Sequence, residues 1–153
     1  MNEQDLQQVR AIIENLHKSN KKVPYFTDLQ QHNVYGQFFN DLDGEEIEKI
    51  LNIIHDYIKE SILNPKTKWG EMFQRFYVMN QDIFRRFREL NADESNTNTE
   101  EFQTLGKDIE EQLFKFEWIL TQNMMKKPQG LDKVIGAFYD IVYSFFPLYN
   151  QIQ

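Results

Sequence analysis

Residues 43–65, DGEEIEKILNIIHDYIKESILNP, carry the clearest helical pattern of the chain. Large apolar side chains recur there at intervals of three and four residues, which places them on one face of an α-helix. Asp43 and Glu46 have the spacing of a capping box, in which each side chain accepts a hydrogen bond from the backbone N–H of the other residue. Pro65 ends the pattern, because proline cannot continue a helix. We therefore predict a helix over residues 44–63.

The same periodicity extends over most of the chain, and no stretch alternates as a half-buried strand would. Changes of pattern, capping residues and prolines separate the helices from one another. The first predicted helix ends near Ser19. The other predicted helices run from Thr27 to Phe39, from Thr67 to Asn91, from Asn98 to Lys126 and from Leu131 to Phe146. Residues 92–99, ADESNTNT, have no large apolar side chain, and we expect a mobile surface loop there.

These elements predict an all-α fold, in which residues 1–153 form a single domain. Connections of roughly 4–9 residues between five to six helices are typical of an antiparallel bundle or an orthogonal array. Hydrophobic residues make up 41% of the chain, which is too much for a disordered protein. Because the chain has 13 phenylalanines and only three alanines, packing of large side chains must hold the helices together.

Composition excludes several classes of function. A net charge of −7 disfavours broad attraction to nucleic acid, so we expect no nucleic-acid partner. The absence of cysteine excludes disulfides, thiolate metal sites and cysteine nucleophiles. The first 20 residues lack the features of a secretory signal, and no segment approaches the roughly 18 apolar residues of a membrane span. We expect a cytoplasmic protein.

Glu14 and His17 form the one Glu-x-x-His pair of the chain, a spacing that lets two side chains on one helix reach the same metal ion. A carboxylate-bridged dimetal site needs this pair on two helices and a further glutamate from each of two others. On a helical wheel Glu14 lies far from the apolar stripe, which favours a solvated position. We therefore predict no metal site and no cofactor.

Sequence motifs of the common enzyme classes are missing: there is no glycine-rich phosphate loop, nucleophile elbow or zinc-binding His-Glu-x-x-His helix. Neighbouring glutamates such as Glu110 and Glu111 point about 100° apart on a helix, so they do not converge on one reacting atom. We therefore expect a protein that is not an enzyme.

Arginines interrupt the phenylalanine-rich segment as Phe84-Arg85-Arg86-Phe87-Arg88. Interleaved arginine and aromatic side chains can bind single-stranded nucleic acid or an acidic protein segment. The alternative is that they form ion pairs with acidic neighbours, and we favour that interpretation because the rest of the chain is acidic.

The C-terminal segment suggests the leading hypothesis for function, which is binding to another protein or self-association into a homodimer. A helix that is apolar nearly all round is either central in the core or covered by a partner. Exposed aromatic side chains mark interfaces. The candidate partner-binding residues are Phe138, Tyr139, Tyr143, Phe146 and Tyr149.

The second hypothesis is a ligand sensor that holds a fatty acid or another small apolar molecule between its helices. By analogy, the length and helical character suit a globin-like domain without haem, because no histidine follows His55 to serve as a proximal ligand. A charged side chain at the pocket mouth could hold a carboxylate through two hydrogen bonds. The candidate ligand-binding residues are Phe73, Arg75, Phe76, Phe84 and Phe116.

Overall fold

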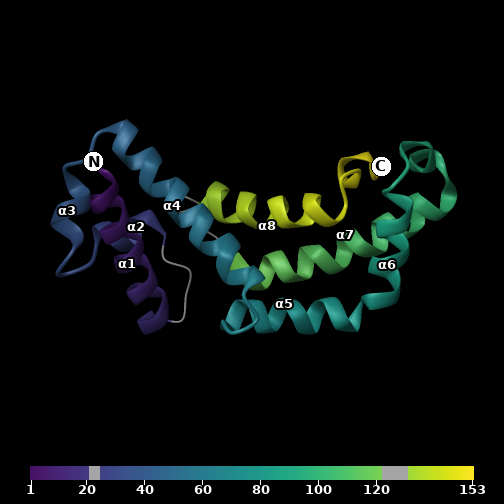
Figure 1. Cartoon of the computed structure of the whole chain (residues 1–153), viewed down its shortest axis with the longest axis horizontal. Coiled ribbons are helices and arrows are strands. Elements are labelled where there is room, and N and C mark those ends of the chain that lie inside the picture. The colour runs from purple at the N-terminus through teal and green to yellow at the C-terminus, as the bar shows by residue number, and fades with distance from the viewer. Residues whose placement is uncertain (21–24, 122–130) are drawn as a thin grey trace. The chain divides into compact units, whose positions relative to one another are not determined.

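The computed structural model describes residues 1–20, 25–121 and 131–153 (Figure 1). Over these residues the chain forms eight α-helices and two 3-10 helices and no strand, which confirms the all-α prediction. The helices are α1 (Glu3–Asn20), α2 (Phe26–Gln30), α3 (Gly36–Asn40), α4 (Gly44–Leu63), α5 (Lys68–Met79), α6 (Gln81–Leu90), η1 (Glu94–Asn98), α7 (Glu100–Thr121), α8 (Leu131–Phe145) and η2 (Tyr149–Gln151). None of the helices in the described ranges is long and apolar enough to cross a membrane.

Contacts between Cα atoms divide the chain into two compact units. Unit 1 comprises Met1–Glu60 and the described part of Asn123–Ala137. Unit 2 comprises the described part of Ser61–Gln122 together with Phe138–Gln153. Helices α4 and α8 each contribute residues to both units. The expectation of a single domain stays a prediction.

The predicted caps of two helices are confirmed. The backbone N–H of Glu46 donates to Asp43 at 2.8 Å and that of Asp43 donates to Glu46 at 3.4 Å, as in a capping box. The backbone N–H of Gly70 donates to the Thr67 hydroxyl at 3.0 Å at the start of α5. The start of α7 differs from the prediction, because Thr99 rather than Asn98 accepts the hydrogen bond from a first-turn N–H.

Two predicted helices are each divided in the structure, which accounts for eight helices instead of five or six. Between α2 and α3, the His32 Nδ1 atom accepts hydrogen bonds from the backbone N–H groups of Val34 at 3.1 Å and Tyr35 at 3.2 Å. Between α5 and α6, the Asn80 side-chain amide donates to the Phe76 carbonyl at 2.8 Å. At the first break the side chain takes backbone donors that a continuous helix would use, and at the second the side-chain amide shares the Phe76 carbonyl with the Asn80 backbone N–H, which lies 3.3 Å from it.

Residues 92–99 contain the 3-10 helix η1. Asp93 caps it by accepting from the Ser95 N–H at 2.9 Å, and the Asn96 amide donates to the Leu90 carbonyl at 3.1 Å. The segment therefore has regular structure and hydrogen bonds to its neighbours, whereas its mobility stays a prediction.

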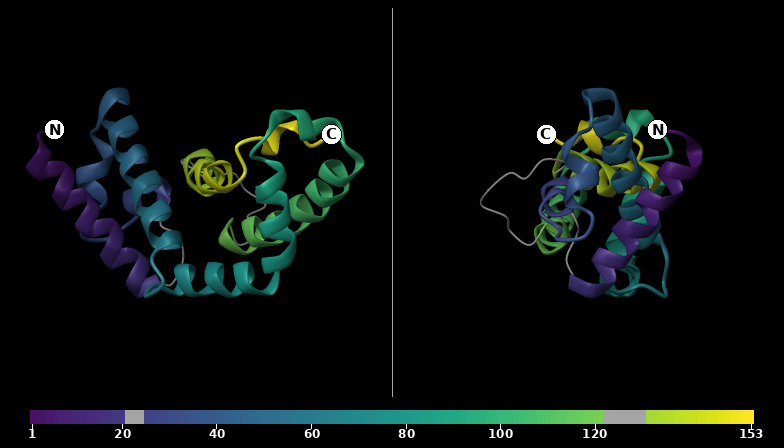
Figure 2. Two further views of the ribbon diagram at one scale, coloured as in Figure 1. Left: turned by 45° about the vertical axis from the view of Figure 1, so that its right-hand side comes forward. Right: turned by 90° about the vertical axis from the view of Figure 1, so that its left-hand side faces the viewer.

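In unit 1, helix α1 runs beside α4 (Figure 2). Polar contacts join the two helices: Arg10 pairs with Glu60, and the His17 Nδ1 atom lies 2.6 Å from the Tyr57 hydroxyl. Burial lowers the pKa of His17 because it disfavours the charged ring. Both helices also carry fully buried apolar residues, which include Val9, Ile13, Ile50 and Ile54.

Phenylalanine rings form the core of unit 2. The ring of Phe116 on α7 lies 5.4 Å from Phe73 on α5 and 5.2 Å from Phe138 on α8, between ring centroids. Phe87 on α6 lies 5.0 Å from both Phe102 and Phe146. Each ring pair adds a specific contact to the apolar area that it buries. Helix α7 therefore joins the other helices of unit 2, and Figure 1 shows it beside α5.

The start of α5 packs closely against the preceding turn, and this contact can be tested by substitution. A Cβ atom at Gly70 would collide with the Asn64 carbonyl oxygen, whereas a Cβ at Gly44 would meet nothing within 4 Å. We expect Gly70→Ala to lower the free energy of unfolding by about 1–3 kcal/mol or more, because backbone must move. We expect Gly44→Ala to be neutral or slightly stabilising, because alanine favours helix. Urea denaturation measures both variants, and equal stability of the two would contradict the packing described.

Candidate functional site

The structure separates the five predicted partner-binding residues into core and surface. Phe138 and Phe146 have exposed fractions of 0% and 3%, so they belong to the core of unit 2. Tyr139 and Tyr149 are half-buried, and Tyr143 is 41% exposed. The three tyrosines lie together, whereas the two phenylalanines contribute almost no accessible surface.

The tyrosine cluster, Tyr139, Tyr143 and Tyr149, is built from α8 and the C-terminal segment. Tyr139 and Tyr143 are four residues apart on α8, which places them on one side of the helix. The Tyr149 ring lies 6.0 Å from Tyr139 and 5.8 Å from Tyr143, and it is perpendicular to the latter. Pro147 follows the end of α8, and the chain turns there so that Tyr149 returns to the helix that carries its partners.

Hydrogen bonds from α7 and from Asn91, the residue that follows α6, hold the C-terminal segment in place. The Asn91 side chain, which is buried, accepts from the Leu148 N–H at 2.7 Å. Gln103 donates to the Gln151 carbonyl at 3.0 Å and accepts from the Gln153 N–H at 2.8 Å. The position of Tyr149 is therefore fixed by contacts on both sides of it in the sequence.

Two glutamates of α7 accompany the tyrosines. The Tyr139 hydroxyl donates to Glu117 Oε2 at 2.8 Å, and Glu110 lies two helical turns earlier on α7. Burial, followed by the neighbouring charges of Glu110 and Glu117, raises the pKa of Tyr149 to about 12. Burial and the Glu117 contact also raise the pKa of Tyr139. Both hydroxyls therefore stay protonated at neutral pH and stay available as hydrogen-bond donors.

Exposed aromatic side chains also occur on α7, and they are not among the residues predicted from the sequence. Phe114 is 61% exposed and Trp118 is 50% exposed. The two residues are four positions apart and lie off the apolar stripe that contains Phe116. A helical wheel of the sequence shows this arrangement. Phe114 lies one turn from each of the two glutamates. We name the acid–aromatic surface for its members Glu110, Phe114, Glu117, Tyr139, Tyr143 and Tyr149.

Four of the predicted ligand-binding residues pack against one another. Phe76 lies 5.5 Å from Phe84 and 5.7 Å from Phe116, between ring centroids, and Phe73 also contacts Phe116. Arg75 is exposed, and its guanidinium lies 2.6 Å from Glu71 one turn earlier on α5. The rings occupy the space between their helices, and ligand binding by these residues stays a prediction.

Two of the remaining arginines of the phenylalanine-rich segment, Arg85 and Arg86, form ion pairs with acidic neighbours in unit 2, as in the favoured interpretation. Arg86 contacts Glu101 on α7 at 2.5 Å and Glu89 at 3.2 Å, and these carboxylates raise its pKa. Arg85 lies 3.5 Å from Asp82. The Arg88 guanidinium lies 5.4 Å from the centre of the Phe145 ring. These pairs are solvent-exposed, so each contributes little to stability.

The Glu-x-x-His pair of α1 has ordinary partners. Glu14 lies 2.9 Å from Lys18, whose hydrogen bond and charge lower the pKa of the carboxyl. His17 contacts Tyr57, as described above. Among the described residues, no group of three or more histidine, aspartate or glutamate side chains is arranged to hold a metal ion.

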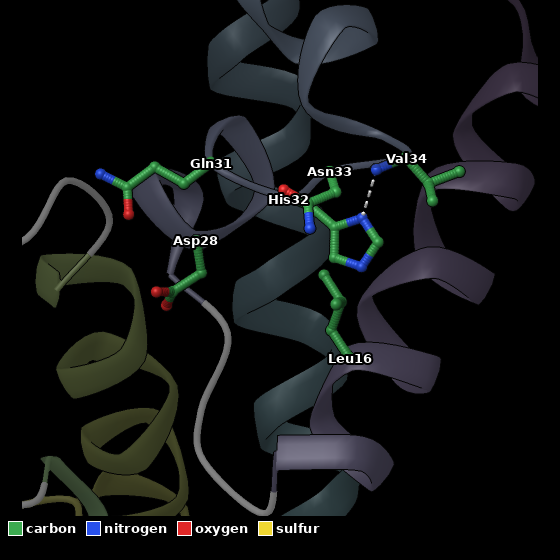
Figure 3. Close-up of a pocket in the computed structure, with 6 residues that line it drawn as sticks. All are labelled: Leu16, Asp28, Gln31, His32, Asn33 and Val34. Carbon is green, nitrogen blue, oxygen red and sulfur yellow. Dashed lines mark hydrogen bonds between the residues drawn. The ribbon is translucent and has the colours of Figure 1, made fainter.

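Described residues of unit 1 line two open pockets. One of about 490 Å³ lies where α1 meets the turn after α2 (Figure 3), and its lining residues are Leu16, Asp28, Gln31, His32, Asn33 and Val34. The other, of about 400 Å³, lies between α1 and α3 and is lined by Gln8, Val9, Ala11, Ile12, Asn15, Val34, Tyr35 and Phe38. In Figure 3 the Asp28 carboxylate and the Gln31 amide lie apart from the His32 ring, so the polar groups of the first pocket do not converge.

No family model, curated protein or solved structure matches the chain. A functional hypothesis therefore depends on the chemistry of the surfaces themselves. The acid–aromatic surface combines accessible rings, tyrosine hydroxyls and carboxylates, which can bind a partner through apolar contact, hydrogen bonds and charge.

The electrostatic coupling within this surface predicts a change in tyrosine titration. Glu117→Gln removes a negative charge but keeps an oxygen that can accept from Tyr139. We therefore expect the pKa values of Tyr139 and Tyr149 to fall, while burial keeps them above the ordinary value of about 10. NMR of ¹³Cζ-labelled tyrosine during an alkaline titration measures both, with Glu111→Gln as the control that leaves them unchanged. Unaltered titration in Glu117→Gln would contradict the described contact.

Proposed function

We propose that the protein acts as a non-enzymatic binding protein, which contacts another protein through the acid–aromatic surface. The observation that carries this proposal is the exposure of Phe114, one helical turn from the glutamate that accepts a hydrogen bond from Tyr139, together with the exposure of Trp118 on the same helix. Aromatic side chains are enriched at the centres of protein interfaces, where burying them stabilises the complex. The proposal includes the cytoplasmic location expected above from the sequence.

Core packing does not account for these exposed rings. The apolar stripe of α7 already buries Phe102, Ile109, Leu113, Phe116 and Leu120. Phe114 and Trp118 lie outside that stripe, so they add little to the core of unit 2. Single exposed apolar residues are common, but here rings from α7, α8 and the C-terminal segment occur in one unit beside polar groups, as in an interface.

The tyrosine cluster suits such a role because its geometry exists before binding. Ring contacts and the Glu117 hydrogen bond hold Tyr139 and Tyr149, and hydrogen bonds to Asn91 and Gln103 hold the flanking backbone. Fixed side chains lose little conformational freedom when a partner binds. A partner would therefore meet a surface that is already ordered.

Site-specific crosslinking tests the proposal without disturbing the core. Deleting α8 is unsuitable, because Phe138, Ile141 and Val142 are buried. We would place the photoreactive residue p-benzoylphenylalanine at position 114, and at Gln74 on the exposed side of α5 as the matched control. We expect a discrete protein adduct at position 114 and none at position 74 after irradiation of cells that contain the protein.

An adduct with a second copy of the chain would support self-association, and sedimentation velocity over a range of concentrations would then show a dimer. An adduct of another mass would support a different protein partner. The proposal is wrong if the yields at positions 114 and 74 are the same and the purified chain sediments as a monomer at every concentration.

A further inference from the structure

The acid–aromatic surface contains carboxylates without a basic partner. No ion pair within 4 Å joins Glu110 or Glu117 to a lysine or arginine in the part of the chain that the structure describes. The arginines of unit 2 lie on α5 and α6, where Arg75, Arg85 and Arg86 have acidic neighbours of their own. Charge complementarity therefore favours a cationic group as the occupant of this surface.

Two lysines of α7 offset part of the negative charge of its glutamates. Lys107 lies one turn before Glu110, and Lys115 lies two residues before Glu117, on a different side of α7. Residues 107–117 carry two basic and four acidic side chains, so this segment is negative overall. The carboxylates keep an excess of negative charge that a partner could neutralise.

The tyrosine rings provide a second means of binding a cation. An arginine or lysine over the face of a tyrosine is attracted by the ring quadrupole. The chain makes such contacts internally, since the Arg10 guanidinium lies 5.8 Å from the Tyr57 ring centre and Arg88 lies 5.4 Å from that of Phe145. Tyr143 is partly exposed, so its ring is accessible to a side chain from outside.

We propose that this surface binds a basic segment of a partner protein, with arginine or lysine side chains placed at the two glutamates and against the tyrosine cluster. This inference rests on the proposed function and adds the chemistry of the partner. An arginine is the better fit, because its planar group forms paired hydrogen bonds with a carboxylate and stacks on aromatic rings.

The spacing of the carboxylates defines the segment further. Glu110 and Glu117 are seven residues apart on α7, which corresponds to about 10 Å along the helix. A peptide in the polyproline II conformation rises about 3.1 Å per residue and has three residues per turn, so side chains three residues apart lie on one face and span nearly the same distance. The expected pattern is Arg-x-x-Arg, and an apolar residue between the arginines would contact Phe114.

Binding of a labelled peptide to the full chain tests this inference. The probe is a six-residue peptide, Gly-Arg-Leu-Ala-Arg-Gly, with blocked ends and a fluorophore whose anisotropy reports binding. Citrulline in place of both arginines keeps the shape and removes the charge. We expect the arginine peptide to bind at least tenfold more tightly than the citrulline peptide, with an affinity that weakens as salt is added.

Variants of the protein separate a specific site from general attraction to an acidic chain. We expect the double variant Glu110→Gln with Glu117→Gln to weaken binding at least tenfold. The matched control, Glu94→Gln with Glu100→Gln, removes the same charge elsewhere in unit 2 and should change binding less than twofold. Tyr143→Leu should weaken binding threefold or more, whereas Tyr143→Phe keeps the ring and should restore it.

The inference is overturned if the arginine peptide fails to bind at 1 mM, binds no better than the citrulline peptide, or binds the two double variants equally. An adduct at position 114 in the crosslinking experiment would then leave the proposed function in place with a different partner chemistry. If the chain forms a dimer and the double variant Arg85→Ala with Arg88→Ala dissociates it, a second copy of the chain occupies the surface. That outcome would also overturn the proposal of a separate basic partner.

Discussion

Packing of phenylalanine rings around Phe116 is the interaction on which unit 2 depends. This ring contacts Phe73 and Phe76 on α5 and Phe138 on α8, so it joins three helices at one position. With only three alanines in the chain, few helix pairs can approach closely through small side chains. Burial of large rings must therefore supply much of the free energy that holds these helices together.

This core determines what the other side of α7 can do. Because Phe116 and its neighbours along the stripe face inward, Glu110, Phe114 and Glu117 face away from the core. Helix α8 presents Tyr139 and Tyr143 for the same reason, since its buried side includes Phe138 and Val142. The acid–aromatic surface thus lies on the sides of α7 and α8 that face away from the phenylalanine core. Tyr149 of the C-terminal segment also belongs to this surface.

Local patterns in the sequence predict the helices and two of their caps, because a capping box or an apolar stripe depends on nearby residues. The breaks at His32 and Asn80 are not predicted, because they depend on hydrogen bonds between a side chain and the backbone that the spacing of apolar residues does not show. The sequence places the three tyrosines in one candidate set with Phe138 and Phe146, and partner binding by that set stays a prediction. Glu117 is not in the set, because 22 residues separate it from Tyr139 and only tertiary packing brings them together. Periodicity could not show that Phe138 and Phe146 are buried, because α8 is apolar on nearly every side.

The most direct test of this account compares two phenylalanines that are two residues apart on α7. Phe116 is 2% exposed and Phe114 is 61% exposed. Urea denaturation of Phe116→Ala should show a loss of about 3–5 kcal/mol in the free energy of unfolding, because a buried ring leaves a cavity. Phe114→Ala should change it by less than about 0.5 kcal/mol, as expected for an exposed side chain. If Phe114→Ala destabilises the protein as much as Phe116→Ala does, Phe114 belongs to the core and the division of α7 into a packing face and a binding face is wrong.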